Sequence, residues 1–210
     1  MKSVLISIQP KWVELIASGK KTIEVRKTRP NLPTTFKCYI YCTINKRGED
    51  VLLIDTNGEN VQFGDYRNAF TCDADGKVYC NIGNGKVIGE FVCDRIDEFH
   101  EWQLTPSKEF YEVEQENLDL FLKESCLTYN EVCKYRKNLP YIKPLYGWHI
   151  SDLKIYDKPK ELSEFRKPCP HSEDMLCHLC EKSGYMPDME IGCFNTITRP
   201  PQSWCYVEGE

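Results

Sequence analysis

The sequence predicts an α+β fold, a small β-barrel with flanking helices and a cysteine-rich C-terminal extension. Three observations support this prediction. Short segments with strand-like alternation are bounded by Asn-Gly or Asp-Gly pairs, which favour tight hairpin turns. Two or three segments with helical spacing interrupt these strands. Five of the twelve cysteines fall between residues 169 and 205, where the composition shifts toward proline, lysine and glutamate.

The N-terminal part is predicted to run strand, helix, turn, strand. Residues 4–8 form a short apolar strand, and a helix over residues 10–18 opens on a proline, which is tolerated at the first helical position. Gly19 is placed to end this helix in a left-handed turn. Residues 22–26 then alternate with period two, so Glu24 and Arg26 should point together, away from the core side.

The rest of the chain alternates strand and helix signals. Thr128 begins a Thr-x-x-Glu capping box, which marks the start of a helix. The predicted strands lie at 36–43, 51–55, 86–96 and 146–155, and the region 106–137 is predicted to be mostly helical.

Composition and charge bound the function. With 28% charged and 12% aromatic residues the chain is typical of a folded protein, and it has neither an export signal nor an apolar run long enough to span a membrane. We therefore expect a cytoplasmic protein with no membrane partner. The net charge of −5 argues against coating of nucleic acid through phosphates alone. The first 29 residues nevertheless carry seven Lys and Arg against two acids, so any anion site is local.

The clustered cysteines predict a structural zinc site. The Cys-x-x-Cys pair at 177–180 is the commonest half of a zinc knuckle, because its two thiolates can occupy adjacent tetrahedral positions. His171 or His178 could substitute for a cysteine, and free thiols or a redox pair are the alternatives. The preferred ligands are Cys169, Cys177, Cys180 and Cys193.

The segment Gly19-x-Lys21-x-x-Glu24-x-Arg26 resembles the signature of the ASCH domain, a branch of the PUA-like superfamily. The resemblance continues in "GKVIGEFVCDRI", "SCLTYNEV" and "GWHISDLKIYD". The pairing of "WHISDLKIYDKPKELSEF" with "RPPQSWCYVE" is similar to ASCH proteins of bacteriophages and prophages. The resemblance to this family implies an ASCH domain over residues 1–166, a cysteine-rich insertion over 167–200, and a tail over 201–210 that docks on the barrel.

The resemblance implies a cleft that binds RNA, a modified nucleoside or a nucleotide. Arg26 can grip a phosphate or a carbonyl edge with two donors, Lys21 supplies a point charge, and Glu24 can accept from an amine or hydroxyl. The alternative is a structural ion pair between Glu24 and Arg26. Trp148 and His149 could reach the ligand, although a core tryptophan and a hydrogen-bonded histidine are the simpler interpretations. The ligand-binding candidates are Lys21, Thr22, Glu24, Arg26, Trp148 and His149.

Two further functions follow from the same resemblance. One ASCH branch is enzymatic: its amidohydrolases remove the acetyl group from N4-acetylcytidine with a Lys, a Thr and a Glu. Lys21 matches that Lys, but Glu24 stands where the Thr would be, so Lys21, Glu24 and Glu124 are the catalytic candidates only if water is activated directly. Glu116 is a second candidate for the Glu. The other alternative is a phage accessory protein that acts on a host protein or sequesters a signalling nucleotide.

Overall fold

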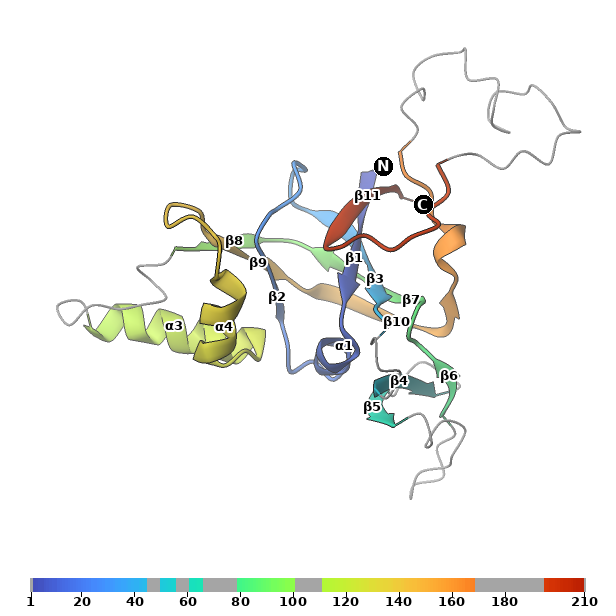
Figure 1. Cartoon of the computed structure of the whole chain (residues 1–210), viewed down its shortest axis with the longest axis horizontal. Coiled ribbons are helices and arrows are strands. Elements are labelled where there is room, and N and C mark those ends of the chain that lie inside the picture. Colours follow the sequence, from blue (N-terminus) through green and yellow to red (C-terminus); the bar gives the residue numbers. More distant parts are fainter. Residues whose placement is uncertain are drawn as a thin grey trace, which may run out of the picture.

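The computed structural model describes residues 2–44, 50–55, 61–65, 79–100, 111–168 and 195–209 (Figure 1). The helices are α1 (Pro10–Ala17), α3 (Tyr111–Ser125), α4 (Tyr129–Arg136) and the 3-10 turn η2 (Leu162–Glu164). The strands are β1 (Lys2–Ile8), β2 (Ile23–Arg26), β3 (Phe36–Cys42), β4 (Asp50–Asp55), β5 (Val61–Asp65), β6 (Tyr79–Ile82), β7 (Val87–Cys93), β8 (Ile96–Phe99), β9 (Leu145–His149), β10 (Ser151–Lys160) and β11 (Trp204–Glu208).

A five-stranded sheet forms the centre of the fold, in the order β10-β7-β3-β1-β11. β1 runs parallel to β3 and antiparallel to β11, so the first and last described strands lie side by side, as Figure 1 shows. Both of its faces are buried: Val4, Ile6 and Ile8 pack in the main core, and Leu5 packs in a second cluster on the other face, next to the buried Ser3 and Ser7. β1 is therefore an interior strand, and β11 is what covers its outer edge.

A second sheet, β2-β9-β8, carries the signature strand between two apolar layers. Ile23 and Val25 pack with Leu118 and Phe121 of α3, which fixes one face of β2. Glu24 pairs in register with Trp148 of β9, so these two side chains share the opposite face. Both faces of β2 are thus covered.

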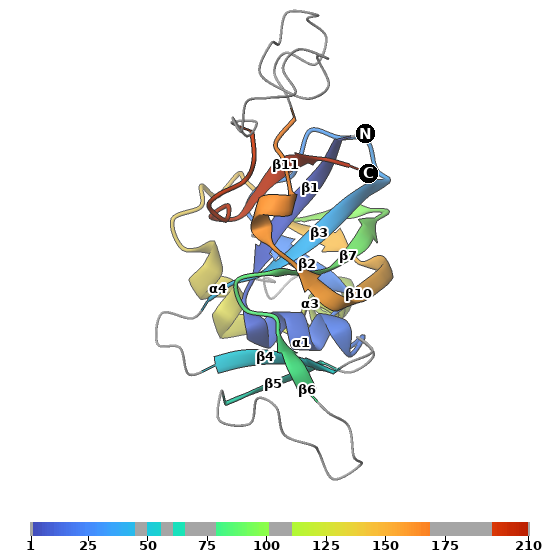
Figure 2. The same ribbon diagram turned by 90° about the vertical axis from the view of Figure 1, so that its right-hand side faces the viewer.

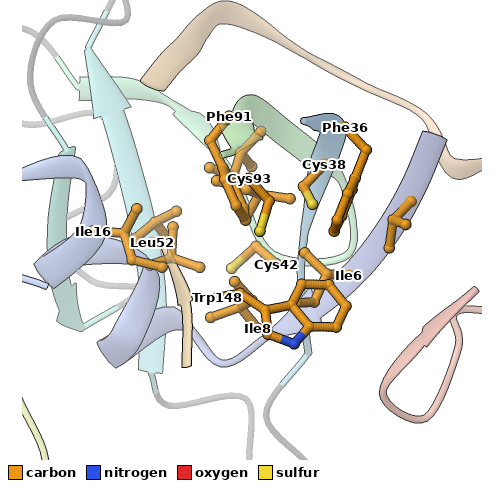
Figure 3. Close-up of a cluster of buried hydrophobic side chains, with 14 of the residues drawn as sticks. Ile6, Ile8, Ile16, Phe36, Cys38, Cys42, Leu52, Phe91, Cys93 and Trp148 are labelled. Carbon is orange, nitrogen blue, oxygen red and sulfur yellow. The ribbon is translucent and has the colours of Figure 1, made fainter. Parts of the chain in front are cut away.

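A third sheet, β5-β4-β6, packs against α1, which lies between it and the central sheet (Figure 2). The main core gathers side chains from β1, β3, β4, β7, β9 and α1, among them Trp148 and three cysteines (Figure 3). Cys38, Cys42 and Cys93 are buried there, while Cys133 is exposed on α4. Burial raises the pKa of all three core thiols, that of Cys93 to about 12, so they stay protonated and apolar.

Several local predictions are confirmed. The first helix spans Pro10–Ala17, one residue short of the prediction, and Gly19 has the left-handed φ of +72° that a Cβ would disfavour. The capping box at Thr128 is formed with both reciprocal hydrogen bonds. The predicted strand 146–155 is instead two strands that meet at Ile150. Residues before Ile150 form β9 and pair with β2, whereas residues after it form β10 and pair with β7.

The mixed α+β class is confirmed, whereas the pairings among the described strands give three open sheets. The placement of Glu24 and Arg26 away from a core was wrong: their face of β2 is turned toward the main core, and Ile23 and Val25 face a second one under α3. The cysteine-rich stretch 169–194 lies outside the described residues. None of the helices described is both long and apolar enough to cross a membrane.

Candidate functional site

The tight turn after α1 places the signature residues. Gly19 lets the chain reverse, and the Lys21 amide donates to the Leu15 carbonyl (2.9 Å), which ties the turn back to α1. Two residues later β2 begins, and the amide of Thr22 donates to the carbonyl of Glu124 (2.9 Å) at the end of α3. These two bonds hold the main chain near the start of the signature, and the pairing of β2 with β9 holds the rest, so its side chains are fixed in direction.

Lys21, Glu24 and Arg26 form a buried charge cluster. One Glu24 oxygen lies 3.4 Å from Lys21 Nζ, and the other lies 3.0 Å from Arg26 Nη2. Their side chains are only 2%, 9% and 10% exposed, respectively. A carboxylate held between two desolvated cations interacts far more strongly than a surface ion pair. The cluster carries a net charge of about +1, which favours an anionic or electron-rich group beside it.

Arg26 joins three separate segments. Besides Glu24, its Nη2 donates to the Ser7 carbonyl at the end of β1 (2.6 Å), and its Nη1 reaches the hydroxyl of Ser203 before β11 (3.4 Å). Its Nε is buried and has no hydrogen-bond partner among the described residues. An unpaired buried N–H is unfavourable. The described residues therefore leave one buried donor of Arg26 without a hydrogen bond.

Lys21 is anchored from the opposite side. Its Nζ donates to the carbonyl of Ser125 (2.7 Å) and lies 5.5 Å from the ring centre of Trp12. These contacts hold the ammonium near Glu24. Lys21 thus supplies a fixed positive charge at the cleft wall.

A cleft of about 1030 Å³ opens over this cluster. Its walls come from the end of β1, α1, β2, α4 and the residues before β11. Four cations and two carboxylates line it, a local net charge of +2 in a chain of net charge −5; they are Lys21, Arg26, Lys27 and Lys134 with Glu24 and Glu131. The volume lies at the upper end of the usual range for small-molecule sites.

Aromatic side chains give the cleft flat apolar surfaces. Trp12, Tyr41 and Tyr135 all line it, and Lys27 Nζ lies 5.1 Å from the Tyr135 ring centre. Burial raises the pKa of Tyr135, and the nearby Glu24 carboxylate raises it further, against a lowering by Arg26. The Tyr135 hydroxyl is therefore protonated at neutral pH and can donate a hydrogen bond.

The structure brings together only part of the predicted ligand-binding set. Lys21, Glu24 and Arg26 line the cleft, whereas Thr22 is exposed and outside its lining. Trp148 shares the face of Glu24 but is fully buried against Phe36, with ring centres 5.9 Å apart, and does not line the cleft. The central sheet covers it, so it cannot stack on a ligand without repacking.

His149 and Glu124 are also placed outside the cleft lining. His149 Nε2 lies 2.7 Å from Asp97 Oδ2 and 2.8 Å from Arg95 Nη2, so it belongs to a charged group on the β8–β9 side of the sheet. Glu124 contributes its carbonyl to Thr22, and Glu116 is exposed on α3. Of the catalytic candidates, the structure brings only Lys21 and Glu24 into contact.

The predicted zinc ligands cannot be placed. Cys169, Cys177, Cys180 and Cys193 all lie in the stretch 169–194, outside the described residues. Within the described ranges, no group of three or more His, Cys, Asp or Glu side chains is arranged to hold a metal ion. The zinc site therefore stays a prediction.

Several lining residues were not predicted from the sequence. Ser7 and Ser203 complete the contacts of Arg26, and α4 supplies Lys134 and Tyr135. The likeness of the "RPPQSW" segment to phage proteins is the sequence signal that points to Ser203. Nothing in the local sequence of α4 could show that it faces β2.

The fold and the cleft define a mixed α+β protein with a charged, ligand-sized site. The profile of the ASCH domain family matches residues 6–128, more than half of the chain, so the chain belongs to this family. Among solved structures it is similar to the ASCH protein from Zymomonas mobilis, at 14% identity, covering 98% of this chain and 87% of that one, with a TM-score of 0.49. A mutant of that protein with tyrosine replaced by phenylalanine matches at 15% identity, 99% and 91% coverage and the same TM-score. The search of the curated proteins found no match.

Proposed function

We propose that this ASCH domain binds a nucleotide, a modified nucleoside or the end of a single-stranded RNA in the cleft over Lys21, Glu24 and Arg26. The observation that carries the proposal is the positively charged, aromatic-walled cleft in an acidic chain. A nucleotide combines an anionic phosphate, a flat apolar ring and polar ring edges. The cleft offers a counterpart for each of these.

The roles of individual residues follow from their surroundings. Lys134 lines the cleft and makes no ion pair within the described part of the chain, so its ammonium is available to a phosphate. Trp12 and Tyr135 supply flat surfaces for a base. Arg26 Nε is a buried donor with no partner among the described residues, and we propose that it donates to a carbonyl or phosphate oxygen of the ligand.

Calorimetric titration with nucleosides and nucleoside 5′-monophosphates tests this proposal. We expect the Lys134→Ala variant to bind monophosphates about fivefold more weakly or worse, while Lys143→Ala, an exposed lysine outside the cleft lining, binds them as the wild type does. Arg26→Ala is a poorer probe, because it also removes contacts that hold the cleft wall. If the wild type binds none of the panel, the proposal is wrong for small ligands.

A second candidate is hydrolysis of an acylated nucleoside. The contact of 3.4 Å between Lys21 and Glu24 at the cleft wall supports it, since such a pair can hold and deprotonate a water molecule. Incubation with N4-acetylcytidine, followed by mass spectrometry, separates the two functions. Loss of the acetyl mass would favour the enzyme, and intact retention would favour the binding module.

We further propose, from the resemblance of the sequence, that the chain is of phage or prophage type and that its fold is PUA-like with a small barrel. It acts in the bacterial cytoplasm, where a host protein is an alternative partner. A zinc ion held by the four cysteines between 169 and 193 would stabilise the cysteine-rich insertion. Metal analysis of the purified protein should give about one zinc per chain, lost in a Cys177→Ser, Cys180→Ser variant.

A further inference from the structure

The segment Pro200–Ser203, here called the strap, forms one wall of the cleft and lies beyond the part matched by the family. Two prolines restrict its backbone. The Ser7 hydroxyl donates to the Pro201 carbonyl (2.7 Å), and the Ser7 amide donates to the Ser203 carbonyl (2.9 Å). Trp204 follows at once, and its indole N–H donates to the Thr28 hydroxyl (3.0 Å). The strap is therefore held on both sides of Gln202.

Gln202 is the one strap residue whose side chain has no structural contact to explain it. It lines the cleft and is exposed, and within the described part of the chain its amide makes no hydrogen bond. The Ser7–Ser203 hydrogen bond continues the β1–β11 register of Ile6 with Trp204, which brings Gln202 beside the end of β1. Gln9 follows there, lines the same cleft and makes no side-chain cap for α1. Two amides that make no hydrogen bond within the described part of the chain thus line the same edge of the cleft.

We infer that Gln202 is a specificity-determining residue that reads the polar edge of a nucleobase, with Gln9 beside it as a second reader. The inference rests on the proposed function and deepens it. A primary amide presents a donor and an acceptor side by side, which matches the adjacent donor and acceptor on a base edge. It is a poor partner for a phosphate, which the cations of the same cleft would hold. The strap then selects the base, while Lys134 and the buried cluster hold the rest of the ligand.

The fixed main chain of the strap favours this role for Gln202. An amide on a freely moving loop loses conformational entropy when it binds, which weakens discrimination. Here the main chain on both sides of Gln202 is already bonded to Ser7. Only the side-chain rotamers of Gln202 remain to be fixed on binding. The binding free energies of correct and incorrect bases can therefore differ by the contribution of the hydrogen bonds that Gln202 makes to the correct base.

The test uses the full-length protein and calorimetric titration with the four nucleoside 5′-monophosphates and with ribose 5-phosphate, which has no base. Gln202→Met keeps the length of the side chain and removes its hydrogen bonds, and Gln202→Ala removes it entirely. Gln62→Ala, an exposed glutamine of β5 outside the cleft lining, is the matched control. Thermal unfolding of each variant checks that it is folded.

We expect both Gln202 variants to weaken binding of the preferred monophosphate at least about fivefold and to reduce the differences among the four. Binding of ribose 5-phosphate should be unchanged in all variants. If the wild type discriminates among the bases and Gln202→Met discriminates equally well, the inference is overturned while the proposed function stands. If the wild type binds ribose 5-phosphate as tightly as every monophosphate, no base is read and the inference fails. If it binds none of these ligands, the proposed function fails together with the inference.

Discussion

Replacing Glu24 with Gln should destabilise the protein strongly, because it removes the carboxylate that lies between two buried cations. Glu24 lies 3.4 Å from Lys21 and 3.0 Å from Arg26, and all three side chains are at most 10% exposed. Gln is nearly the same size, so the change alters charge rather than packing. The ammonium charge of Lys21 and the guanidinium charge of Arg26 would then remain in a desolvated site without a compensating negative charge.

The expected magnitude follows from this burial. Removing one partner of a buried pair costs about 3–5 kcal/mol, and the lower end applies here because Lys21 and Arg26 keep hydrogen bonds to the carbonyls of Ser125 and Ser7. A loss of about 3 kcal/mol in a chain of this size lowers the melting temperature by roughly 6–12 °C. Removing Lys21 as well, by Lys21→Met in the same chain, should restore part of the loss, since one of the unpaired charges is then gone.

Urea unfolding followed by tryptophan fluorescence measures the effect. Glu98→Gln is the matched control, because Glu98 pairs with Arg29 at 3.7 Å on the surface, where both side chains are at least 41% exposed. That pair should contribute less than about 1 kcal/mol. If Glu24→Gln changes the free energy of unfolding no more than Glu98→Gln does, the cluster is solvated in solution and the reasoning from its burial is refuted.

Three further predictions concern stability and thiol chemistry. Burial alone would raise the pKa of Glu90, but hydrogen bonds led by the one from the Tyr156 hydroxyl lower this pKa below its ordinary 4.5. The stability that Glu90 contributes is therefore present above pH 4.5 and is lost as the pH falls through the folded pKa. The difference in free energy of unfolding between wild type and Glu90→Gln, measured with urea, should shrink over that acid range. Peptide mapping after iodoacetamide treatment of the folded protein should find Cys133 alkylated and Cys93 intact until urea is added; early labelling of Cys93 would contradict its burial. Thr128→Ala removes the capping box of α4 and should cost about 1 kcal/mol, and an unchanged urea midpoint would mean that tertiary contacts alone hold this helix end.

The sequence predicts those features of this fold that depend on near neighbours. The turn at Gly19, the capping box at Thr128 and the period-two strand after Lys21 each follow from a few adjacent residues, and the structure contains all three. That Glu24 and Arg26 share one face could also be predicted, since side chains two apart on a strand must point the same way.

The burial of the charge cluster could not be predicted from the sequence, because it depends on segments far apart in the chain. Arg26 is completed by Ser7 and Ser203, and Lys21 by the carbonyl of Ser125. Hydrophobic alternation identifies a strand's two faces, but it does not say that both will be covered. Trp148 is different, because a core tryptophan is the simpler interpretation of the sequence, and the structure confirms it.

The pairing of β1 with β11 has a consequence for how the chain is made. β1 is synthesised before the other described strands, yet its outer edge is covered by residues 204–208, about 200 positions later. During translation the outer edge of β1 therefore stays unpaired until β11 has been synthesised. An unpaired strand edge is a site at which another strand can pair incorrectly. The strap is synthesised with the same segment, so its wall of the cleft and the contact of Ser203 with Arg26 form last. A nascent chain that already contains the whole family-matched region still lacks β9, β10 and β11, and it cannot hold a ligand in this cleft until the strap has left the ribosome.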